Sequence, residues 1–297
     1  MLEIKNVSVS FNNKRVLENV SIDGVAGEII GVVAPNGTGK STLLHVMINF
    51  LQPNEGSVLF EKKYTYPKDE IYIRKQIAFL PDQADLFNDM TGYEHLKFYA
   101  RMWNAEIDKT DAIIERLHMA TYVKKKVKTY SLGMRQRLCF AMVLVADTKT
   151  MLLDEVMNGL DPSNVALISE ILNELKRKGK LIFIASHLLN NLDLYADRVL
   201  YLHNANIIHE LKLNEDTDLF LKISAPHKHL ETIKTMITYP KEKSIQAENL
   251  LCIPIENITH EKIFEWMEIC LSNSIKEVTI GPIGTSEYYE LFYRKGV

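Results

Sequence analysis

The chain has 297 residues, of which 46% are hydrophobic and 25% charged, and it carries a formal net charge of −3. This is the composition of a globular protein that is long enough for one large domain and a smaller one. The small negative charge excludes a general attraction to nucleic acid, so no nucleic-acid partner is expected.

The first part of the chain is predicted to be β-structure. Apolar residues alternate over 4–9 and again over 16–22, on either side of a turn at Asn12-Asn13. The short apolar run 28–33 is typical of a buried central strand. A glycine-rich loop follows it, and residues 41–50 are apolar on most sides, which predicts a buried helix.

Helices are predicted next, before strands return. Thr91 and Glu94 fit a capping box at the start of one helix, and a second helix is expected over residues 108–120. Strands are expected at 150–153, 181–185 and 198–203, with helical stretches between them. Strands that alternate with helices predict a doubly wound α/β core, into which a helical block of about residues 88–130 is inserted.

The pattern changes again after residue 213. The expected order is a strand, a helix, a hairpin, a helix and a strand, at 219–224, 228–237, around 247–249, 260–272 and 275–280. This β-α-β-β-α-β order suits a small ferredoxin-like α+β module, and a final helix is expected over 286–293. We therefore expect two domains, 1–213 and 214–297.

The loop after the strand at 28–33 has the spacing of a phosphate-binding P-loop. Its residues, with the one that follows, are Ala34, Pro35, Asn36, Gly37, Thr38, Gly39, Lys40, Ser41 and Thr42. Glycines let backbone N–H groups surround phosphates, and the next helix adds its positive end. Lys40 is expected to reach the β- and γ-phosphates of ATP, and Ser41 to ligate Mg²⁺. Because Ala34 stands where a first glycine is usual, the prediction rests on the two inner glycines, Lys40 and Ser41.

Two adjacent carboxylates end the apolar strand at 150–153. Asp154 is placed to hold Mg²⁺ or a water bound to it, and Glu155 to polarise an attacking water. The pattern is weak by itself, and it gains weight because a P-loop precedes it.

Residues 129–138, which read Thr-Tyr-Ser-Leu-Gly-Met-Arg-Gln-Arg-Leu, identify the kind of P-loop protein. They closely resemble the LSGGQ-type signature of ATP-binding cassette (ABC) ATPases. A serine at this point can cap the following helix and direct its positive end toward a phosphate. The resemblance implies that this phosphate belongs to ATP bound across a dimer interface. The residues implied to act on the second subunit are Ser131, Leu132, Gly133, Met134, Arg135 and Gln136.

The resemblance implies roles for other residues as well. Phe11 is expected to stack on adenine with Val16 packed beside it, and Asp161 to lie in the D-loop at the dimer interface. His187 is expected to be the switch histidine that contacts the γ-phosphate, so Glu155 and His187 are the expected catalytic residues. The expected metal ligands are Ser41, Asp82 and Asp154.

Two positions depart from the family pattern. The usual glutamine of the Q-loop aligns with Asp82, and Gln83 comes next, so either residue could serve there. Our hypothesis is that Asp82 contacts Mg²⁺ or the attacking water. Val156 and Met157 replace the Pro-Thr that usually follows the catalytic glutamate.

The implied fold is an ABC cassette, a P-loop NTPase with a RecA-like core, an antiparallel β subdomain and a helical subdomain. The implied function is the ATP-hydrolysing subunit of an ABC transporter, most similar to the antibiotic-peptide (bacitracin and lantibiotic) and multidrug export group. Its expected partners are a membrane permease and a second copy of itself or a homologous ATPase subunit.

The expected location is the cytoplasm, on the inner face of the membrane. No apolar run reaches the roughly 18 residues that span a bilayer, and no secretory signal is visible. Cys139, Cys252 and Cys270 lie far apart among apolar residues, and we expect them to be small buried hydrophobes.

The surface predicted to receive the permease is the loop 81–90 with the helix that follows. Its aromatic residues are Phe87, Tyr93, Phe98 and Tyr99, each of which could instead pack the helical insertion. The basic run 124–128 is either a lipid-headgroup contact or, more simply, a solvated face.

Two other functions remain open on the sequence alone. A soluble ABC ATPase acting on a ribosome or nucleic-acid complex usually has two cassettes or a long coiled coil, and this chain has one cassette, no heptads and no basic excess. The other is a non-hydrolysing regulatory subunit, and the presence of Glu155 and His187 argues against it.

Overall fold

The computed structural model describes residues 1–187, 189–213, 215, 218–275 and 277–294. The chain divides into two compact units, Met1–Glu210 and Leu211–Val297. Residue Asn214, the predicted start of the second domain, lies outside the described residues. Among the described residues, no helix has the length and apolar character that crossing a membrane requires.

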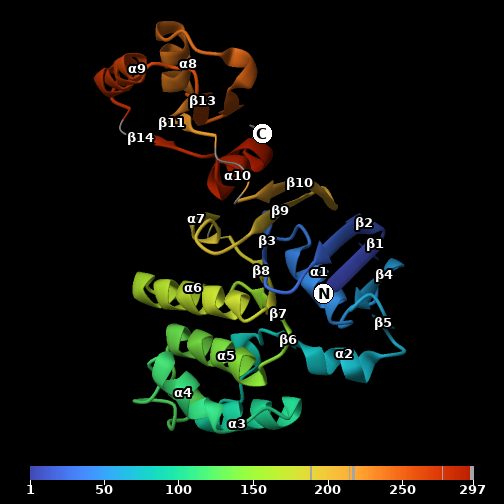
Figure 1. The fold of residues 1–297 in the computed structure, drawn as a ribbon. Helices are drawn as coiled ribbons and strands as arrows, with labels where there is room; N and C mark the ends of the chain where they lie inside the picture. Colours follow the sequence, from blue (N-terminus) through green and yellow to red (C-terminus); the bar gives the residue numbers. More distant parts are fainter. Residues whose placement is uncertain (188, 214, 216–217, 276, 295–297) are drawn as a thin grey trace. The chain divides into compact units, whose positions relative to one another are not determined.

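A six-stranded sheet in the order β10-β9-β3-β8-β7-β6 forms the centre of the first unit (Figure 1). Its strands are β3 (Ile29–Val33), β6 (Ile77–Phe79), β7 (Thr150–Asp154), β8 (Leu181–Ala185), β9 (Arg198–His203) and β10 (Asn206–Lys212). β3 pairs in parallel with β8 and β9, and β7 pairs in parallel with β6 and β8. Every residue of β3 and β8 is buried, which explains their unbroken apolar sequences. The predicted α/β core is therefore confirmed.

A second sheet of the first unit is antiparallel and has the order β2-β1-β4-β5. Its strands are β1 (Leu2–Phe11), β2 (Lys14–Gly24), β4 (Glu55–Phe60) and β5 (Tyr64–Thr65). Asn12 and Asn13 form the turn between β1 and β2 with φ of 46° and 65°. Asparagine tolerates this left-handed backbone, which suits the twist of a tight hairpin. Phe11 is thereby held at the end of β1.

The helices of the first unit are α1 (Lys40–Met47), α2 (Glu70–Gln76), α3 (Gly92–Trp103), α4 (Lys109–Arg116), α5 (Leu132–Ala146), α6 (Pro162–Arg177) and α7 (Leu189–Leu192). The predicted capping box of α3 is present: Glu94 N donates to Thr91 Oγ1 at 3.1 Å, and Thr91 N to Glu94 Oε2 at 2.7 Å. Helix α4 is shorter than predicted because His118, with φ of 53°, leaves the helical backbone. Figure 1 shows α3, α4 and α5 grouped on a different side of this unit from the antiparallel sheet.

The second unit contains β11 (Phe220–Ser224), α8 (His227–Met236), β12 (Ile245–Ala247), β13 (Leu250–Pro254), α9 (His260–Ser272), β14 (Glu277–Gly281) and α10 (Thr285–Tyr293). Its sheet has the order β12-β13-β11-β14, and the neighbouring strands are antiparallel. Trp266 of α9 and Leu230 of α8 belong to the core beneath this sheet. Lys276, inside the predicted last strand, lies outside the described residues.

Candidate functional site

The carboxyl ends of the parallel strands meet at one edge of the central sheet. Ala185 of β8 is in register with Val32 of β3 on one side and with Asp154 of β7 on the other. The segments that leave these strands therefore start side by side, although they are far apart in the chain. Ligands of open α/β sheets bind at such an edge.

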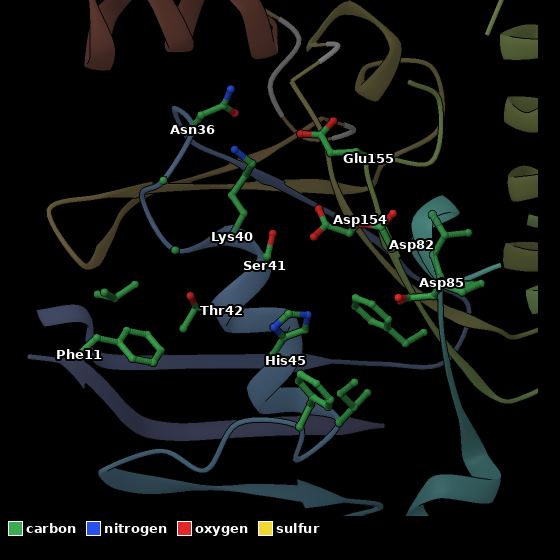
Figure 2. Close-up of a pocket in the computed structure, with 18 residues that line it drawn as sticks. Phe11, Asn36, Lys40, Ser41, Thr42, His45, Asp82, Asp85, Asp154 and Glu155 are labelled. Carbon is green, nitrogen blue, oxygen red and sulfur yellow. The ribbon is translucent and has the colours of Figure 1, made fainter. Parts of the chain in front are cut away.

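A cavity of about 870 Å³ lies at this edge. Its walls include these predicted site residues: Phe11, Val16, Asn36, Gly37, Gly39, Lys40, Ser41, Thr42, Asp82, Asp154 and Glu155. Figure 2 shows Lys40 and Ser41 at its centre, between Phe11 on one side and the carboxylates of Asp154 and Glu155 on the other. The structure thus brings together residues from β1, β2, the loop after β3, α1, the segment after β6, and the end of β7 with the residue that follows it.

Three loop residues of the predicted set do not line the cavity: Ala34, Pro35 and Thr38. They hold the loop from behind instead. Thr38 Oγ1 donates to Pro35 O at 2.6 Å, and Lys40 Nζ donates to Ala34 O at 2.7 Å. The alanine at the usual first glycine position is buried and contributes its carbonyl, which any residue could supply.

The inner glycines are required by the backbone of the loop. Gly37 has φ of 75° and Gly39 φ of 113°, a region that residues with a Cβ rarely adopt. A Cβ on Gly39 would also lie 2.9 Å from Val16 O. Val16, predicted to pack beside Phe11, therefore also leaves no room for a side chain at position 39.

Lys40 is a buried cation, with 7% of the residue exposed. Desolvation lowers its pKa, and the nearby carboxylates of Glu155 and Asp154 act in the opposite direction. Its ammonium donates to the backbone carbonyls Ala34 O at 2.7 Å and Pro35 O at 3.3 Å. A buried ammonium with neutral acceptors gains most from an anion, so Lys40 is suited to bind phosphate.

Glu155 and His187 form a hydrogen-bonded pair. His187 Nδ1 lies 2.7 Å from Glu155 Oε2, and Glu155 N donates to Ala185 O at 2.9 Å. Glu155 has a left-handed backbone with φ of 52°, which is uncommon for a residue with a side chain. His187 N also donates to Glu155 Oε2 at 3.4 Å, so two hydrogen bonds join the two predicted catalytic residues at the ends of neighbouring strands.

The two residues proposed for the Q-loop point to different places. Asp82 lines the cavity, and its Oδ1 accepts from Ala84 N at 2.8 Å, which caps the short 3₁₀ helix Gln83–Asp85. Gln83 is not among the residues that line the cavity, and its Nε2 donates to Gln136 Oε1. This placement favours Asp82 over Gln83 as the residue that faces a bound metal.

Several cavity residues were missed by sequence-based prediction: His45, Ile48, Phe50, Phe79, Leu80, Pro81 and Asp85. The signal for His45 was its position four residues after Ser41, on the same helical face. Asp85 lies three residues after Asp82, at the end of the short 3₁₀ helix that Asp82 caps. The aromatic side chains could not be found, because apolar residues near a loop are usually core.

The residues that could hold a metal suit a magnesium ion that also binds the phosphates of the substrate. Within the part of the chain that the structure describes, no three His, Cys, Asp or Glu side chains converge to hold a metal by themselves. Mg²⁺ in nucleotide sites is held by one or two carboxylates together with phosphate oxygens and water. Asp154, Asp82 and the Ser41 hydroxyl all face the cavity and supply such a set.

The predicted signature lies outside the cavity. Met134 N donates to Ser131 Oγ at 3.3 Å, so Ser131 caps α5 as predicted. A Cβ on Gly133 would lie 3.4 Å from Gly159 O, and one on Gly159 only 2.6 Å from Leu132 Cδ2. The first turn of α5 therefore packs directly on the D-loop turn of the same subunit.

Asp161 caps helix α6. Its Oδ1 accepts from Ser163 Oγ at 2.6 Å and from Asn164 N at 3.0 Å. These bonds, with a further one from the Asn164 side chain, lower the pKa of Asp161 to about 2.

Two signature side chains are placed differently from the prediction. Gln136 is 4% exposed, and its Nε2 donates to Val156 O at 2.8 Å within its own subunit. Arg135 Nη2 donates to Asn88 Oδ1 at 2.8 Å. Both side chains bond to groups of their own subunit, so the exposed first turn of α5 is the part of the signature that is available to a second subunit.

The unusual Val156-Met157 sequence has a packing explanation. Both residues are buried. Met157 Sδ lies 3.9 Å from Asn191 Nδ2 and 3.9 Å from Tyr195 OH, groups in and after α7. Met157 thus fills the space between the turn that carries Glu155 and the segment that follows His187.

The residues predicted to meet a permease fall into two classes. Phe87 and Phe98 are 57% and 45% exposed. Tyr99 stacks on Trp103 with ring centroids 5.2 Å apart, and burial raises its pKa to about 12. Tyr93 lies beneath Lys97 Nζ at 4.5 Å. Of these four residues, the two phenylalanines therefore present the larger apolar surface.

The basic run 124–128 lies on the surface apart from Val127. Asp89 Oδ1 pairs with Lys128 Nζ at 2.9 Å and with Lys126 Nζ at 3.7 Å. These pairs favour the solvated-face interpretation of this run.

Cys139, Cys252 and Cys270 are buried, as predicted.

Comparison with known proteins agrees with this geometry. The family described as ABC transporter matches residues 17–158. The uncharacterized ABC transporter ATP-binding protein YhcH of Bacillus subtilis is 32% identical over 233 residues, which cover 76% of either chain. The lantibiotic transport ATP-binding protein SrtF of Streptococcus pyogenes is 29% identical over 219 residues, 74% of this chain and 94% of SrtF.

A similar solved structure is a dimeric ATP-binding cassette in a post-hydrolysis state, bound to ADP and Pi. It superposes with a TM-score of 0.65 at 25% identity, covering 72% of this chain and 99% of that one.

Proposed function

Because this chain belongs to the family of ABC transporter ATP-binding proteins, we propose that it pairs with a second copy or a homologous subunit, closes around two MgATP, and drives a separate membrane permease. The chain is an ABC transporter ATPase. The observation that carries the hydrolytic part of the proposal is the Glu155–His187 hydrogen bond at the wall of the Lys40 cavity. A carboxylate held by an imidazole is suited to take a proton from water.

Each wall of the cavity has a role in this proposal. Phe11 stacks on adenine, the backbone around Gly37 and Gly39 surrounds the phosphates, and Lys40 pairs with their charge. Mg²⁺ would neutralise charge that develops on the phosphates. Its proposed ligands, which also line the cavity, are Ser41, Asp82 and Asp154.

The dimer is proposed from the surface of α5. Ser131 caps an exposed helix start beside Leu132, whose side chain lies on the surface. A similar cassette has been solved as a dimer. We assign Ser131, Leu132, Gly133 and Met134 to the phosphate of the second subunit's ATP, with Asp161 in the same interface.

The permease is proposed to dock on the exposed phenylalanines Phe87 and Phe98. Since SrtF is named for lantibiotic transport, we propose export of antibiotic peptides or other amphipathic compounds, with this subunit on the cytoplasmic face of the membrane. YhcH and SrtF are both named as transporter proteins, so action on a ribosome or nucleic-acid complex is not favoured.

The test is recovery of the permease from detergent-solubilised membranes with the tagged full-length chain. We expect to recover a multispan membrane protein that raises ATPase activity. The double variant Phe87→Ser with Phe98→Ser should no longer recover this membrane protein. Phe264→Ser, which changes an exposed phenylalanine of the second unit, should retain it. Repeated failure to recover a membrane protein, with association with ribosomes instead, would overturn the proposal.

A further inference from the structure

A buried amide lies beneath the turn that carries Glu155. Gln136 Nε2 lies 3.1 Å from Glu155 O and 2.8 Å from Val156 O. Both oxygens are backbone carbonyls, which only accept, so the NH₂ of Gln136 must face them and its Oε1 must face away. The NH₂ group of one buried side chain thus donates to two successive backbone carbonyls.

These bonds hold a backbone that is otherwise unfavourable. Glu155 has φ of 52°, and such a conformation persists only where the surroundings constrain it. The N–H of Glu155 is held by Ala185 O, and its carbonyl by Gln136. The direction of a side chain follows from the backbone that carries it, so the peptide after Glu155 sets where the carboxylate points.

We propose that Gln136 is a positioning residue for hydrolysis: it holds the left-handed turn that aims the Glu155 carboxylate at His187 and the cavity. The inference rests on the proposed role of Glu155 as the group that polarises water. It assigns Gln136 to its own subunit's active site, not to the ATP of a second subunit.

Gln83 supports this amide from the other side. Gln83 Nε2 donates to Gln136 Oε1, the atom that faces away from the turn. Gln83 Oε1 is buried, and among the described residues it has no hydrogen-bond partner. Loss of the Gln83 side chain leaves both carbonyl bonds of Gln136 in place. Gln83 is therefore a weaker contributor that acts only through Gln136.

The test compares Gln136→Leu with wild type in the full-length purified chain. Leucine has a similar volume and removes both donors. We expect kcat for MgATP to fall by about 10- to 100-fold, because a misplaced catalytic group loses much of its effect. KM and ATP affinity should stay within about twofold, since no nucleotide contact is removed. Dimers driven by ATP should persist.

A control separates this positioning role from a general destabilisation of helix α5. Met142→Ala opens a cavity further along the same buried helix and leaves the Gln136 side chain in place. If Met142→Ala lowers kcat as much as Gln136→Leu at the same fall in Tm, the proposal is overturned. If the leucine variant does not fold, Gln136→Asn replaces it in the test, because the asparagine side chain is one methylene too short to reach both carbonyls. It should show the same loss of kcat at unchanged KM.

A second measurement tests the link to Gln83. Gln83→Leu should lower kcat less than Gln136→Leu, and the double variant should match Gln136→Leu alone. Fully additive losses would overturn the link. Loss of ATP-driven dimers in Gln136→Leu would overturn the positioning role and favour contact with the second subunit.

Comparison with Glu155→Gln separates the two proposals. If Glu155→Gln retains turnover, the proposed role of Glu155 fails. If Glu155→Gln loses turnover and Gln136→Leu keeps it, only the inference about Gln136 fails.

Discussion

His187 Nδ1 lies 2.7 Å from Glu155 Oε2, which makes one hydrogen-bonded unit of two residues that are 32 positions apart. Each follows a strand of the central sheet, and the strands β7 and β8 are parallel neighbours. A change in either residue therefore disturbs the other, and with it the wall of the cavity that Glu155 lines.

Replacing Glu155 by glutamine keeps the shape of the side chain and removes its negative charge. Glu155→Gln should lower kcat by about 100-fold or more, which is the contribution typical of a general base. ATP binding and ATP-driven dimers should persist. Turnover, nucleotide affinity and size-exclusion chromatography with ATP measure these effects. Glu115→Gln, on the exposed face of α4, is the matched control, and loss of ATP binding in Glu155→Gln would contradict the assigned role.

Lys40→Met should separate stability from ligand binding. Methionine fills a similar volume, and the loss of two bonds to carbonyls is offset by relief from burying a charge, so Tm without nucleotide should stay close to wild type. With ATP at about 100 times its Kd, wild type should gain about 2.7 kcal/mol, or about 5–10 °C in Tm. Lys40→Met should show no such shift in thermal unfolding. A full shift would show that Lys40 does not bind phosphate.

The two inner glycines of the loop should differ in their tolerance of alanine. Gly37→Ala meets no atom within 4 Å, so it should cost about 1–2 kcal/mol for the left-handed backbone alone. Gly39→Ala also meets Val16 O at 2.9 Å, which should raise the cost to about 2–5 kcal/mol. Urea unfolding measures both values, and equal costs would contradict the steric role of Val16.

Gly179→Ala is the control for this pair. Gly179 has φ of 79°, and a Cβ at this position would meet no atom within 4 Å, as at Gly37, but the residue lies far along the chain after α6. It should lose the same stability as Gly37→Ala and retain full ATP affinity. A clearly different loss of stability in Gly179→Ala would show that the cost at Gly37 does not come from the left-handed backbone alone.

Asp82→Asn should raise the magnesium requirement. The asparagine Oδ1 can still accept from Ala84 N, so the cap of the 3₁₀ helix is retained while the charge is lost. The Mg²⁺ concentration for half-maximal ATPase activity should rise about 10-fold. Gln83→Leu should leave it unchanged. The reverse result in a magnesium titration would assign the metal contact to Gln83.

Asp161 should stabilise the chain in a defined pH range. Hydrogen bonds from Ser163 and Asn164 lower its pKa from 3.8 to about 2. The stabilisation is therefore fully present above pH 3.8 and is lost as pH falls through about 2. The difference in Tm between wild type and Asp161→Ala should stay constant above that range and shrink below it. Ser163→Ala, which removes one donor, should move the loss to higher pH; an unchanged profile would count against this cause.

Features that depend on neighbouring residues were predictable. The capping box of Thr91 and Glu94 and the strand Leu181–Ala185 match the structure because their signals are local hydrogen bonding and a short apolar run. The end of α4 was not predictable, because His118 leaves the helix although the apolar pattern continues. The inward direction of Gln136 was also hidden, since the signature sequence does not show which face of α5 is covered.

The sequence by itself determined the chemistry of this protein: the backbone of the loop at Gly37 and Gly39, the cation Lys40, and the carboxylates Asp154 and Glu155. These depend on residue type and spacing, which local geometry converts directly into structure. Only the tertiary structure decided which distant residues share the cavity, because the strand order β3-β8-β7-β6 depends on long-range pairing. It likewise decided that Gln136 is buried within its own subunit, because burial depends on what the rest of the chain covers.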